Sequence, residues 1–296
     1  MSCVGVLTEE RYLNPREKNY YINNILTEDS LIITELERLN ISCSRIAWDS
    51  NPNLSSFKFI LFRTTWNYFE KLNLFIEFLK KHKDSVTMIN SYDQIMWNLD
   101  KKYLFELKSM GINIPKSMMI HQKSTTTLKS VLMKNKWKEV VIKPCVSAAA
   151  WNTYRVSVKE VVKFEPLFKS LVKKQGMLVQ EFQKNIISTG EVSLIVIDGV
   201  FSHAVKKIAQ PGDFRVQDDF GGTVHKYRPS EKEVSFALNV VNSIQGQPIY
   251  ARVDCILDNN LELALSEVEL IEPELWFRMG RASAKKLASA IKKRYF

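Results

Sequence analysis

Residues 250–277 contain seven acidic residues, and three of them, Asp254, Glu267 and Glu269, lie within apolar runs that have the composition of buried β-sheet. Carboxylates crowded together in a sheet repel one another and lose hydration unless a cation lies between them. Oxygen ligands favour Mg²⁺ or Mn²⁺, and Mg²⁺ usually completes its shell with water and the phosphates of a nucleotide. The three acids therefore predict a metal site beside a bound nucleotide.

A β-hairpin is expected to bring these acids together. Two apolar runs flank Asn259-Asn260, and asparagine tolerates a positive φ, so we expect a two-residue turn that pairs Asp258 with Leu261. That register predicts Arg252 opposite Glu267, Tyr250 opposite Glu269, and Asp254 diagonal to Glu267. Because side chains alternate between the faces of a strand, these polar groups would share one face. Leu261, Leu263 and Leu265, expected on that face, argue against the alternative of a solvated acidic face with a surface arginine pair.

Lys143 ends an apolar strand predicted at 139–144, and a buried cation there requires an anion. The next loop, 147–153, consists mainly of small residues and could lay backbone amides over phosphates. A second predicted hairpin turns at Asp198-Gly199 and pairs Glu191 with Lys206. Further elements are expected as follows: a helix at 97–110 capped by Asn98 or Asp100, strands at 117–121, 154–158 and 176–182, helices at 128–134 and 231–244, and a ligand-binding loop at 211–222 with Arg215 at its centre.

Arg63, Trp66 and Tyr68 follow a strand of a predicted N-terminal α/β domain. Short apolar runs alternate with helical patterns in this part of the chain, which is typical of a small parallel sheet. The expected strands are 3–7, 41–47, 57–62 and 86–89, and the expected helices are 20–39 and 72–81. Open α/β sheets bind ligands beyond the carboxyl ends of strands, so the loop 63–68 is predicted to face a substrate. The alternative is an aromatic cluster that closes a domain interface.

The bulk composition predicts a globular protein of about two domains. The chain has 296 residues, 45% of them hydrophobic and 11% aromatic, which is ample for packed cores. Its start lacks a signal-peptide pattern and no uncharged run approaches the ~18 residues of a membrane span, so we expect a soluble, cytoplasmic protein. The four cysteines and four histidines show no zinc-ligand spacing, and we expect the cysteines to be buried free thiols. Neither GxGxxG nor GxxxxGK[ST] occurs, so neither a Rossmann site nor a P-loop is expected.

Positive charge is concentrated at the C-terminal end of the chain. The formal net charge is +10, and residues 278–296 contain seven Lys or Arg and no acid. Ala282, Leu287, Ala290 and Ile291 recur at roughly helical spacing, and the cations come late, which predicts a solvated helix. Binding to nucleic acid or to a membrane surface is the alternative, and the lack of interleaved aromatic residues disfavours it.

Taken in chain order, these features resemble the ATP-grasp carboxylate–amine ligases, which include glutathione synthetase, D-alanine–D-alanine ligase and the RimK-type ligases. The resemblance covers about residues 97–277. The strings RTTWNYF, WNLDKKYL, KPCVSAAAWNT, GDFRVQDDFGG and VELIEPELW look most like the branch that contains a cycloserine-forming O-ureido-serine cyclo-ligase. The resemblance implies an α/β (α+β) ATP-grasp fold, with a parallel pre-grasp domain at 1–95 followed by two α+β subdomains, at 96–178 and 179–296, that grip ATP.

The resemblance also implies roles for individual residues. Those expected to bind ATP are Lys101, Lys143 and Ser147 at the phosphates, Gln180, Glu181 and Phe182 at the adenine, and Glu191 at the ribose. Those expected to bind two Mg²⁺, with Mn²⁺ as an alternative, are Asp254, Glu267 and Glu269. Those expected at the reacting groups are Arg215, Arg252 and Lys206 or Lys207 at the phosphoryl group, and Gly221 and Gly222 at the substrate carboxylate.

The sequence departs from the pattern of the family in two ways. Ala148, Ala149 and Ala150 stand in the lid where such ligases usually have glycine, and alanine disfavours a positive φ. Glu269 stands where many relatives carry asparagine, and an extra anion should bind metal at least as well.

The predicted function is an ADP-forming ligase that joins a carboxylate to an amine through an acyl phosphate. The two groups would belong to small molecules, either separate or combined in one amino-acid-like substrate. A regulatory ATP-binding module without turnover is the alternative, suggested by the alanine-rich lid. We expect no nucleic-acid or membrane partner, and the sequence predicts no particular oligomeric state.

Overall fold

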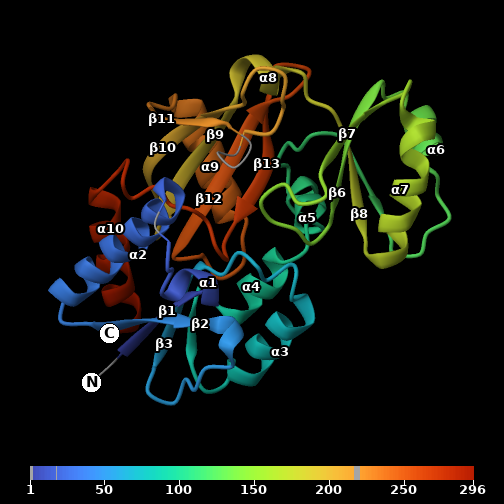
Figure 1. Ribbon diagram of the computed structural model, residues 1–296. Helices are drawn as coiled ribbons and strands as arrows, with labels where there is room; N and C mark the ends of the chain where they lie inside the picture. Colours follow the sequence, from blue (N-terminus) through green and yellow to red (C-terminus); the bar gives the residue numbers. More distant parts are fainter. Residues whose placement is uncertain (1–2, 18, 217–220) are drawn as a thin grey trace.

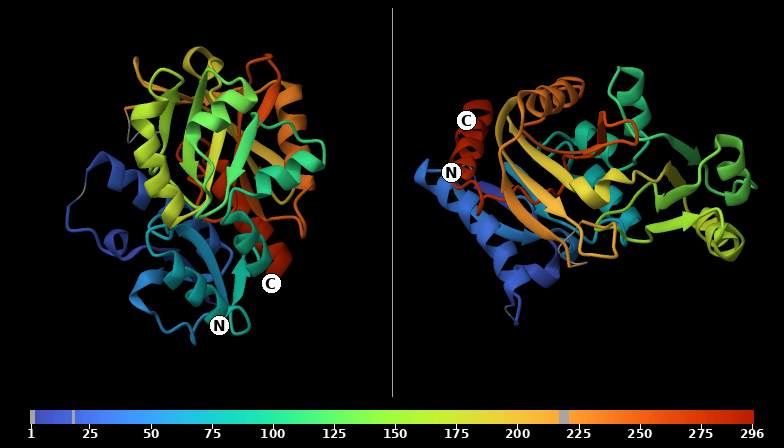
Figure 2. Two further views of the ribbon diagram at one scale, coloured as in Figure 1. Left: turned by 90° about the vertical axis from the view of Figure 1, so that its right-hand side faces the viewer. Right: turned by 90° about the horizontal axis from the view of Figure 1, so that it is seen from above.

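The chain folds around three β-sheets, shown in Figure 1 by a computed structural model that describes residues 3–17, 19–216 and 221–296. One sheet is parallel and N-terminal, and the two later sheets are antiparallel. The second sheet along the chain, residues 117–181, is called the central sheet because of its place in the sequence. Figures 1 and 2 show it at one end of the molecule, and they show helices α2 (Tyr20–Arg38) and α10 (Ala282–Tyr295), from the two ends of the chain, side by side at the other end. This is the α/β architecture that the sequence predicts.

The N-terminal sheet has the strand order β2-β1-β3-β4 and confirms the predicted parallel α/β unit. Its strands are β1 (Cys3–Thr8), β2 (Ser42–Ala47), β3 (Phe59–Thr64) and β4 (Thr87–Ile89), and its helices are α1 (Glu10–Leu13), α2 (Tyr20–Arg38), η1 (Trp48–Ser50), α3 (Leu72–His82) and α4 (Tyr92–Asn98). Helix α2 begins where the Asn19 side chain accepts from the amide of Ile22. Strand β3 runs two residues past its predicted end, so Arg63 and Thr64 belong to the buried strand rather than to a loop.

The central sheet has the order β5-β8-β6-β7, and two helices cover one of its faces. Its elements are α5 (Tyr103–Ser109), β5 (Ser117–Ile120), α6 (Leu128–Asn135), β6 (Glu139–Pro144), β7 (Tyr154–Ser157), α7 (Val161–Lys174) and β8 (Met177–Glu181). The single helix predicted at 97–110 is wrong, because α4 ends at Asn98 and a turn separates it from α5. In that turn Asp100 Oδ1 accepts from the Lys102 amide, and the Lys101 amide donates to the carbonyl of Cys145.

The C-terminal sheet has the order β11-β10-β9-β12-β13. Its elements are α8 (Asn185–Thr189), β9 (Glu191–Ile197), β10 (Val200–Ile208), β11 (Thr223–Tyr227), α9 (Glu231–Asn242), β12 (Tyr250–Leu257), β13 (Leu263–Glu269) and α10 (Ala282–Tyr295). Helix α9 and the central segment around Tyr103 pack on one side of this sheet, and helices α2 and α10 contribute to the core on the other.

Both predicted hairpins exist, but each is shifted by one or two positions in register. The Asp258 carboxylate accepts from the amides of Asn260 and Glu262, which closes a longer turn than the predicted two residues. A further irregularity lies between Leu265 and Glu267. The resulting pairs are Arg252 with Glu269 and Asp254 with Glu267. Leu265 therefore lies in the core while Leu261 is exposed, so the predicted leucine face is wrong.

The hairpin at Asp198-Gly199 has the predicted turn, with positive φ values of 49° and 74°. An irregularity between Phe201 and His203 then shifts the register, so Glu191 pairs with Lys207 and not with Lys206. A β-bulge of this kind adds one residue to one strand and reverses which side chain faces the partner.

Helix α10 packs one face against the core and exposes its basic face. Leu287 and Ile291 are buried, as predicted, whereas Ala282 is exposed and Ala284 and Ala288 are buried. No helix in the described part of the chain is both long and apolar enough to cross a membrane. All four cysteines are free thiols, but only Cys145 and Cys255 are buried, so the prediction of burial is wrong for the pair on β1 and β2.

Candidate active site

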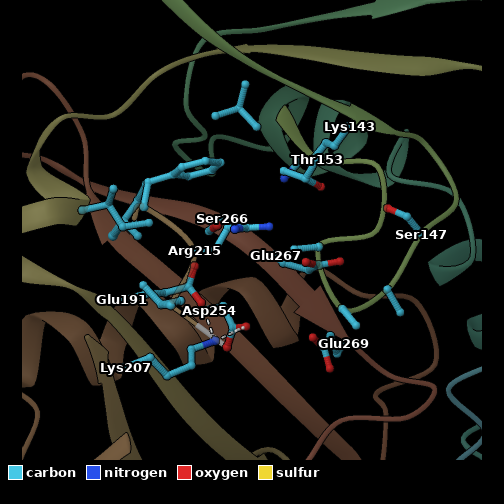
Figure 3. A pocket seen from close by; sticks show the side chains of 18 of the residues that line it. Lys143, Ser147, Thr153, Glu191, Lys207, Arg215, Asp254, Ser266, Glu267 and Glu269 are labelled. Carbon is cyan, nitrogen blue, oxygen red and sulfur yellow. Dashed lines mark hydrogen bonds and ion pairs between the residues drawn. The ribbon is translucent and has the colours of Figure 1, made fainter. Parts of the chain in front are cut away.

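A cavity of about 220 Å³ lies between the central and C-terminal sheets (Figure 3). Strands of both sheets and a segment of the N-terminal domain line it. The lining residues predicted from the sequence are Trp66, Lys101, Lys143, Ser147, Gln180, Glu181, Phe182, Glu191, Lys207, Arg215, Arg252, Asp254, Glu267 and Glu269. Fourteen separately predicted side chains therefore surround one space.

The C-terminal sheet contributes a network of paired charges. Lys207 Nζ forms an ion pair with Glu191 and lies 3.0 Å from Asp254 Oδ2. Arg252 Nη2 lies 2.9 Å from the same Asp254 oxygen and also pairs with Glu269. Burial opposes ionisation of Asp254, but Arg252 and Lys207 outweigh it and lower the pKa of that carboxyl. The register described above, not the predicted one, makes these pairs possible.

The central sheet contributes Lys143, near the end of β6. Among the residues that the structure describes, no acid pairs with it and no hydrogen bond holds its ammonium group. Burial lowers the pKa of Lys143, an effect that nearby Glu267 only partly offsets. A desolvated cation facing a cavity has the chemistry of an anion-binding group.

Lys101 bridges the two walls of the cavity. Its ammonium group donates to the carbonyl of Ser147 at 2.8 Å and lies 2.9 Å from Glu267 Oε1. Burial opposes its charge, but Glu267 outweighs this effect and raises the pKa of Lys101. Lys101 is therefore charged and ties the start of the lid to strand β13.

The lid adopts the backbone conformation that alanine disfavours. Ala149, Ala150 and Asn152 have φ values of 48°, 52° and 50°, in the left-handed region. The ring of Trp151 packs against Phe69 of the N-terminal domain with centroids 5.3 Å apart. This contact helps to hold the strained lid over the cavity.

The hinge residues Gln180, Glu181 and Phe182 all line the cavity. The resemblance implies that the backbone of this hinge lines the adenine, and in this structure the amides of Glu181 and Phe182 donate to the carbonyls of Lys116 and Glu139. The Phe182 ring has the Arg155 guanidinium 3.9 Å from its centroid, and Phe214 packs edge-on against it.

Arg215 reaches the cavity from the loop after β10. Its guanidinium donates three hydrogen bonds to the Asp213 carboxylate, and this hydrogen bonding lowers the pKa of Asp213 to about 2. Residues 217–220 of the predicted ligand loop lie outside the described residues. Gly221 and Gly222, next to them, are not among the cavity-lining residues.

Of the three predicted substrate-facing residues, only Trp66 lines the cavity. Its Nε1 donates to the carbonyl of Glu272 at 2.9 Å. Arg63 is 1% exposed and lies beside the Phe277 ring, and Tyr68 packs against Phe75. The predictions for Arg63 and Tyr68 are corrected because strand β3 and the aromatic core extend further than expected.

Several residues that line the cavity were not predicted from the sequence, namely Tyr21, Ser266, Glu272, Glu274 and Trp276. Glu272 is 7% exposed, and none of the described residues forms a hydrogen bond or ion pair with its carboxylate. Burial, together with Glu269 and Glu267, raises its pKa well above the usual range. The spacing of acids in VELIEPELW could have identified it.

The carboxylates match a hard divalent cation in chemistry but not yet in arrangement. In residues 3–17, 19–216 and 221–296, no three acids, histidines or cysteines converge as a ready-made metal site. Arg252 and Lys101 instead hold Asp254, Glu267 and Glu269. Burial raises the pKa of Glu269 to about 7, and Asp254 and Glu267 add to the effect. A divalent cation would offset this negative charge, so the donor set fits Mg²⁺ if Arg252 releases its carboxylates.

Comparisons with known proteins agree with this geometry. The model of the RimK-like ATP-grasp domain matches residues 100–280, and that of the N-terminal domain of D-cycloserine synthetase DcsG matches residues 4–90. Cycloserine biosynthesis protein DcsG of Streptomyces lavendulae is 24% identical over 83% of this chain and 86% of its own length.

Two solved structures share the fold. The crystal structure of D-cycloserine synthetase DcsG has a TM-score of 0.87, with 21% identity over 99% of both chains. D-alanine–D-alanine ligase from Bacillus anthracis has a TM-score of 0.67, with 14% identity over 99% of this chain and 97% of that one. With more than half of its length matched by the domain model, the chain belongs to the RimK-like ATP-grasp family and is an ATP-dependent, ADP-forming carbon–nitrogen ligase.

Proposed function

We propose that this ligase transfers the γ-phosphoryl group of ATP to the carboxylate of a small amino-acid-like substrate, and that an amine of the same molecule then closes a ring. The first step forms a C–O–P linkage and releases ADP. In the second step the amine nitrogen bonds to the carbonyl carbon, phosphate leaves, and the amine loses a proton. The observation that carries the proposal is one cavity that combines an unpaired cation with a cluster of carboxylates.

Phosphate binding is supported by the cations of the central wall. Lys143 has no ion-pair partner among the described residues, and a triphosphate would neutralise it. Lys101 already lies beside Ser147 at the root of the lid, where a phosphate could share its three donors. Phosphoryl transfer depends mainly on such positioning and charge neutralisation, and it requires no covalent nucleophile from the protein.

Asp254, Glu267 and Glu269 are the residues that would hold Mg²⁺ in this proposal. When bound, the ions would neutralise charge on the phosphates. Arg252, which holds two of these carboxylates, would be released to face the transferring phosphoryl group. Arg215, restrained by Asp213, would contribute a second guanidinium.

The lid supports a reactive acyl phosphate, because such an intermediate is lost if water enters. Ala149 and Ala150 line the cavity, and Trp151 docks their loop on the N-terminal domain. An acid and an amine held in one closed site gain effective concentration, which favours ring closure. The resemblance to a cycloserine biosynthesis protein supports the intramolecular form of the reaction.

The experiment is to incubate the full chain with Mg-ATP, hydroxylamine and a panel of amino-acid-like carboxylates. Hydroxylamine traps an acyl phosphate as a hydroxamate, so ADP and hydroxamate should appear together. Omitting hydroxylamine should then yield a cyclic product from acids that also carry a suitably placed amine. If no acid in the panel gives ADP with hydroxamate, the proposed reaction is wrong.

A further inference from the structure

One buried acid of the cavity, Glu272, has no ion-pair partner among the described residues. It lies on the wall next to the N-terminal domain. Lys207 pairs with Glu191 and Asp254, Arg252 with Glu269, and Lys101 with Glu267. Glu274, also on this wall, pairs with Arg278. Glu272 lines the same cavity, and no residue in the described ranges pairs with its carboxylate.

The surroundings of Glu272 favour a cationic ligand. Burial, followed by the charges of Glu269 and Glu267, opposes ionisation of Glu272, and Lys101 and Arg252 offset this only in part. An incoming positive charge would therefore stabilise the carboxylate. Trp66, which lines the same cavity, is fixed by its hydrogen bond to the Glu272 carbonyl, and Tyr21 packs against its ring. A carboxylate beside aromatic surface is the combination that binds ammonium groups.

Hydrogen bonds to two successive backbone carbonyls hold the segment that carries Glu272. The indole of Trp66 spans from the N-terminal domain to the Glu272 carbonyl at 2.9 Å. The adjacent carbonyl of Ile271 accepts from the buried Tyr250 hydroxyl at 3.1 Å. The backbone that carries Glu272 is therefore held at two successive carbonyls, which limits its movement when a ligand binds.

We propose that Glu272 binds a primary ammonium group of the substrate whose carboxylate is activated, other than the amine that attacks the carbonyl carbon, and that it selects amino acids over acids that lack this ammonium group. The inference rests on the proposed function, because it assigns part of the substrate to the same cavity. It assigns Glu272 a binding role that is distinct from the metal-binding role of Glu267 and Glu269.

Binding can test this assignment without turnover. The affinities of D- and L-serine would be compared with that of 3-hydroxypropanoate, and those of D- and L-alanine with that of propanoate, by calorimetry in Mg²⁺ and a non-hydrolysable ATP analogue. The wild-type chain should bind at least one amino acid about 10-fold or more tightly than its matched acid. The absence of such a preference would overturn the inference.

Two substitutions at position 272 make the test specific. Glu272→Gln should weaken binding of the preferred amino acid by about 10- to 100-fold while changing that of the matched acid by less than about 3-fold. Glu272→Asp keeps the charge and should retain part of the preference. Glu262→Gln, on the exposed tip of the β12–β13 hairpin, is the matched control and should change neither affinity.

Alternative roles of Glu272 give different results. Equal losses for the amino acid and the matched acid would indicate a general structural role, and weaker Mg²⁺ binding would indicate a metal ligand; either would overturn the inference. A clear preference that depends on Glu272, without ADP formation from any acid, would instead reject the proposed reaction and keep the ammonium site. ADP formation that is insensitive to Glu272→Gln would support the proposed reaction and reject the ammonium site.

Discussion

The two walls of the cavity hold their charges in different ways. On the C-terminal sheet, Arg252, Lys207 and Asp254 satisfy one another within hydrogen-bond distance. On the central sheet, Lys143 lies in the same cavity without such a partner among the described residues. A buried ion costs several kcal/mol unless it is compensated. The C-terminal wall is therefore stable by itself, whereas the central wall gains its compensation from a ligand.

Replacing Arg252 should show the largest effect on stability. Arg252→Met leaves Asp254 and Glu269 buried without their guanidinium, so we expect the free energy of unfolding to fall by about 3–5 kcal/mol. Urea unfolding measures this change. Lys232→Met, which breaks an exposed pair with Glu262, is the matched control and should cost less than about 1 kcal/mol. Similar losses of unfolding free energy in both variants would mean that the buried network contributes no more to stability than an exposed ion pair.

Replacing Lys143 should reverse this pattern. Lys143→Met removes a half-buried cation that Glu267 compensates only in part, so stability should stay the same or rise. The ratio kcat/KM for ATP should fall by about 100-fold, because a charged hydrogen bond to phosphate is lost. Unfolding and steady-state ADP formation, measured on the same sample, separate the two effects. A loss of stability comparable to that of Arg252→Met would remove the contrast between the walls.

The strained lid offers a smaller test. The double substitution Ala149→Gly and Ala150→Gly removes the strain of two alanines with positive φ but makes the unfolded chain more flexible. We therefore expect the free energy of unfolding to rise by about 0.5–1 kcal/mol. Ala148→Gly, at a position with ordinary φ, should instead destabilise the chain. Thermal unfolding decides between these signs. Destabilisation by all three changes would show that the lid backbone is not strained.

The smallest expected effect is a pH dependence behind the C-terminal wall. Burial lowers the pKa of His203, whose Nδ1 lies 2.8 Å from Ser283 Oγ on α10. The unfolded chain therefore binds a proton at this position at a higher pH than the folded chain does. Stability should fall as the pH drops below about 6.5, the ordinary pKa of histidine, until the folded imidazole is also protonated. His203→Asn should flatten this part of the pH profile of unfolding; an unchanged slope would exclude His203 as its source.

Much of the fold could be predicted from local patterns. Period-two runs, helical spacing and the Asp198-Gly199 turn act over a few residues, and they located most strands and helices within one or two positions. The register of the hairpins could not be predicted in this way. It depends on the Asp258 side chain, which lengthens one turn, and on single irregularities near Phe201 and Leu265.

The candidate site shows the same division. The types of its residues were predictable, because buried acids and lysines at strand ends require compensation. Their partners were not: one position of register decides that Lys207, rather than Lys206, meets Glu191. Tyr21 and Glu272 were not predicted as site residues. They line the cavity because the N-terminal domain packs against β13 and the segment after it, and a local sequence pattern does not show that packing.

The most direct test of the central claim is a calorimetric titration of the wild-type chain, Lys143→Met and Glu267→Gln with ATP, in Mg²⁺ and in EDTA. A cavity that combines an uncompensated cation with metal-binding carboxylates predicts tight binding only by the wild-type chain in Mg²⁺. We expect affinity to fall by about 100-fold in EDTA or in either variant. Equal affinity in all of these conditions would contradict the account.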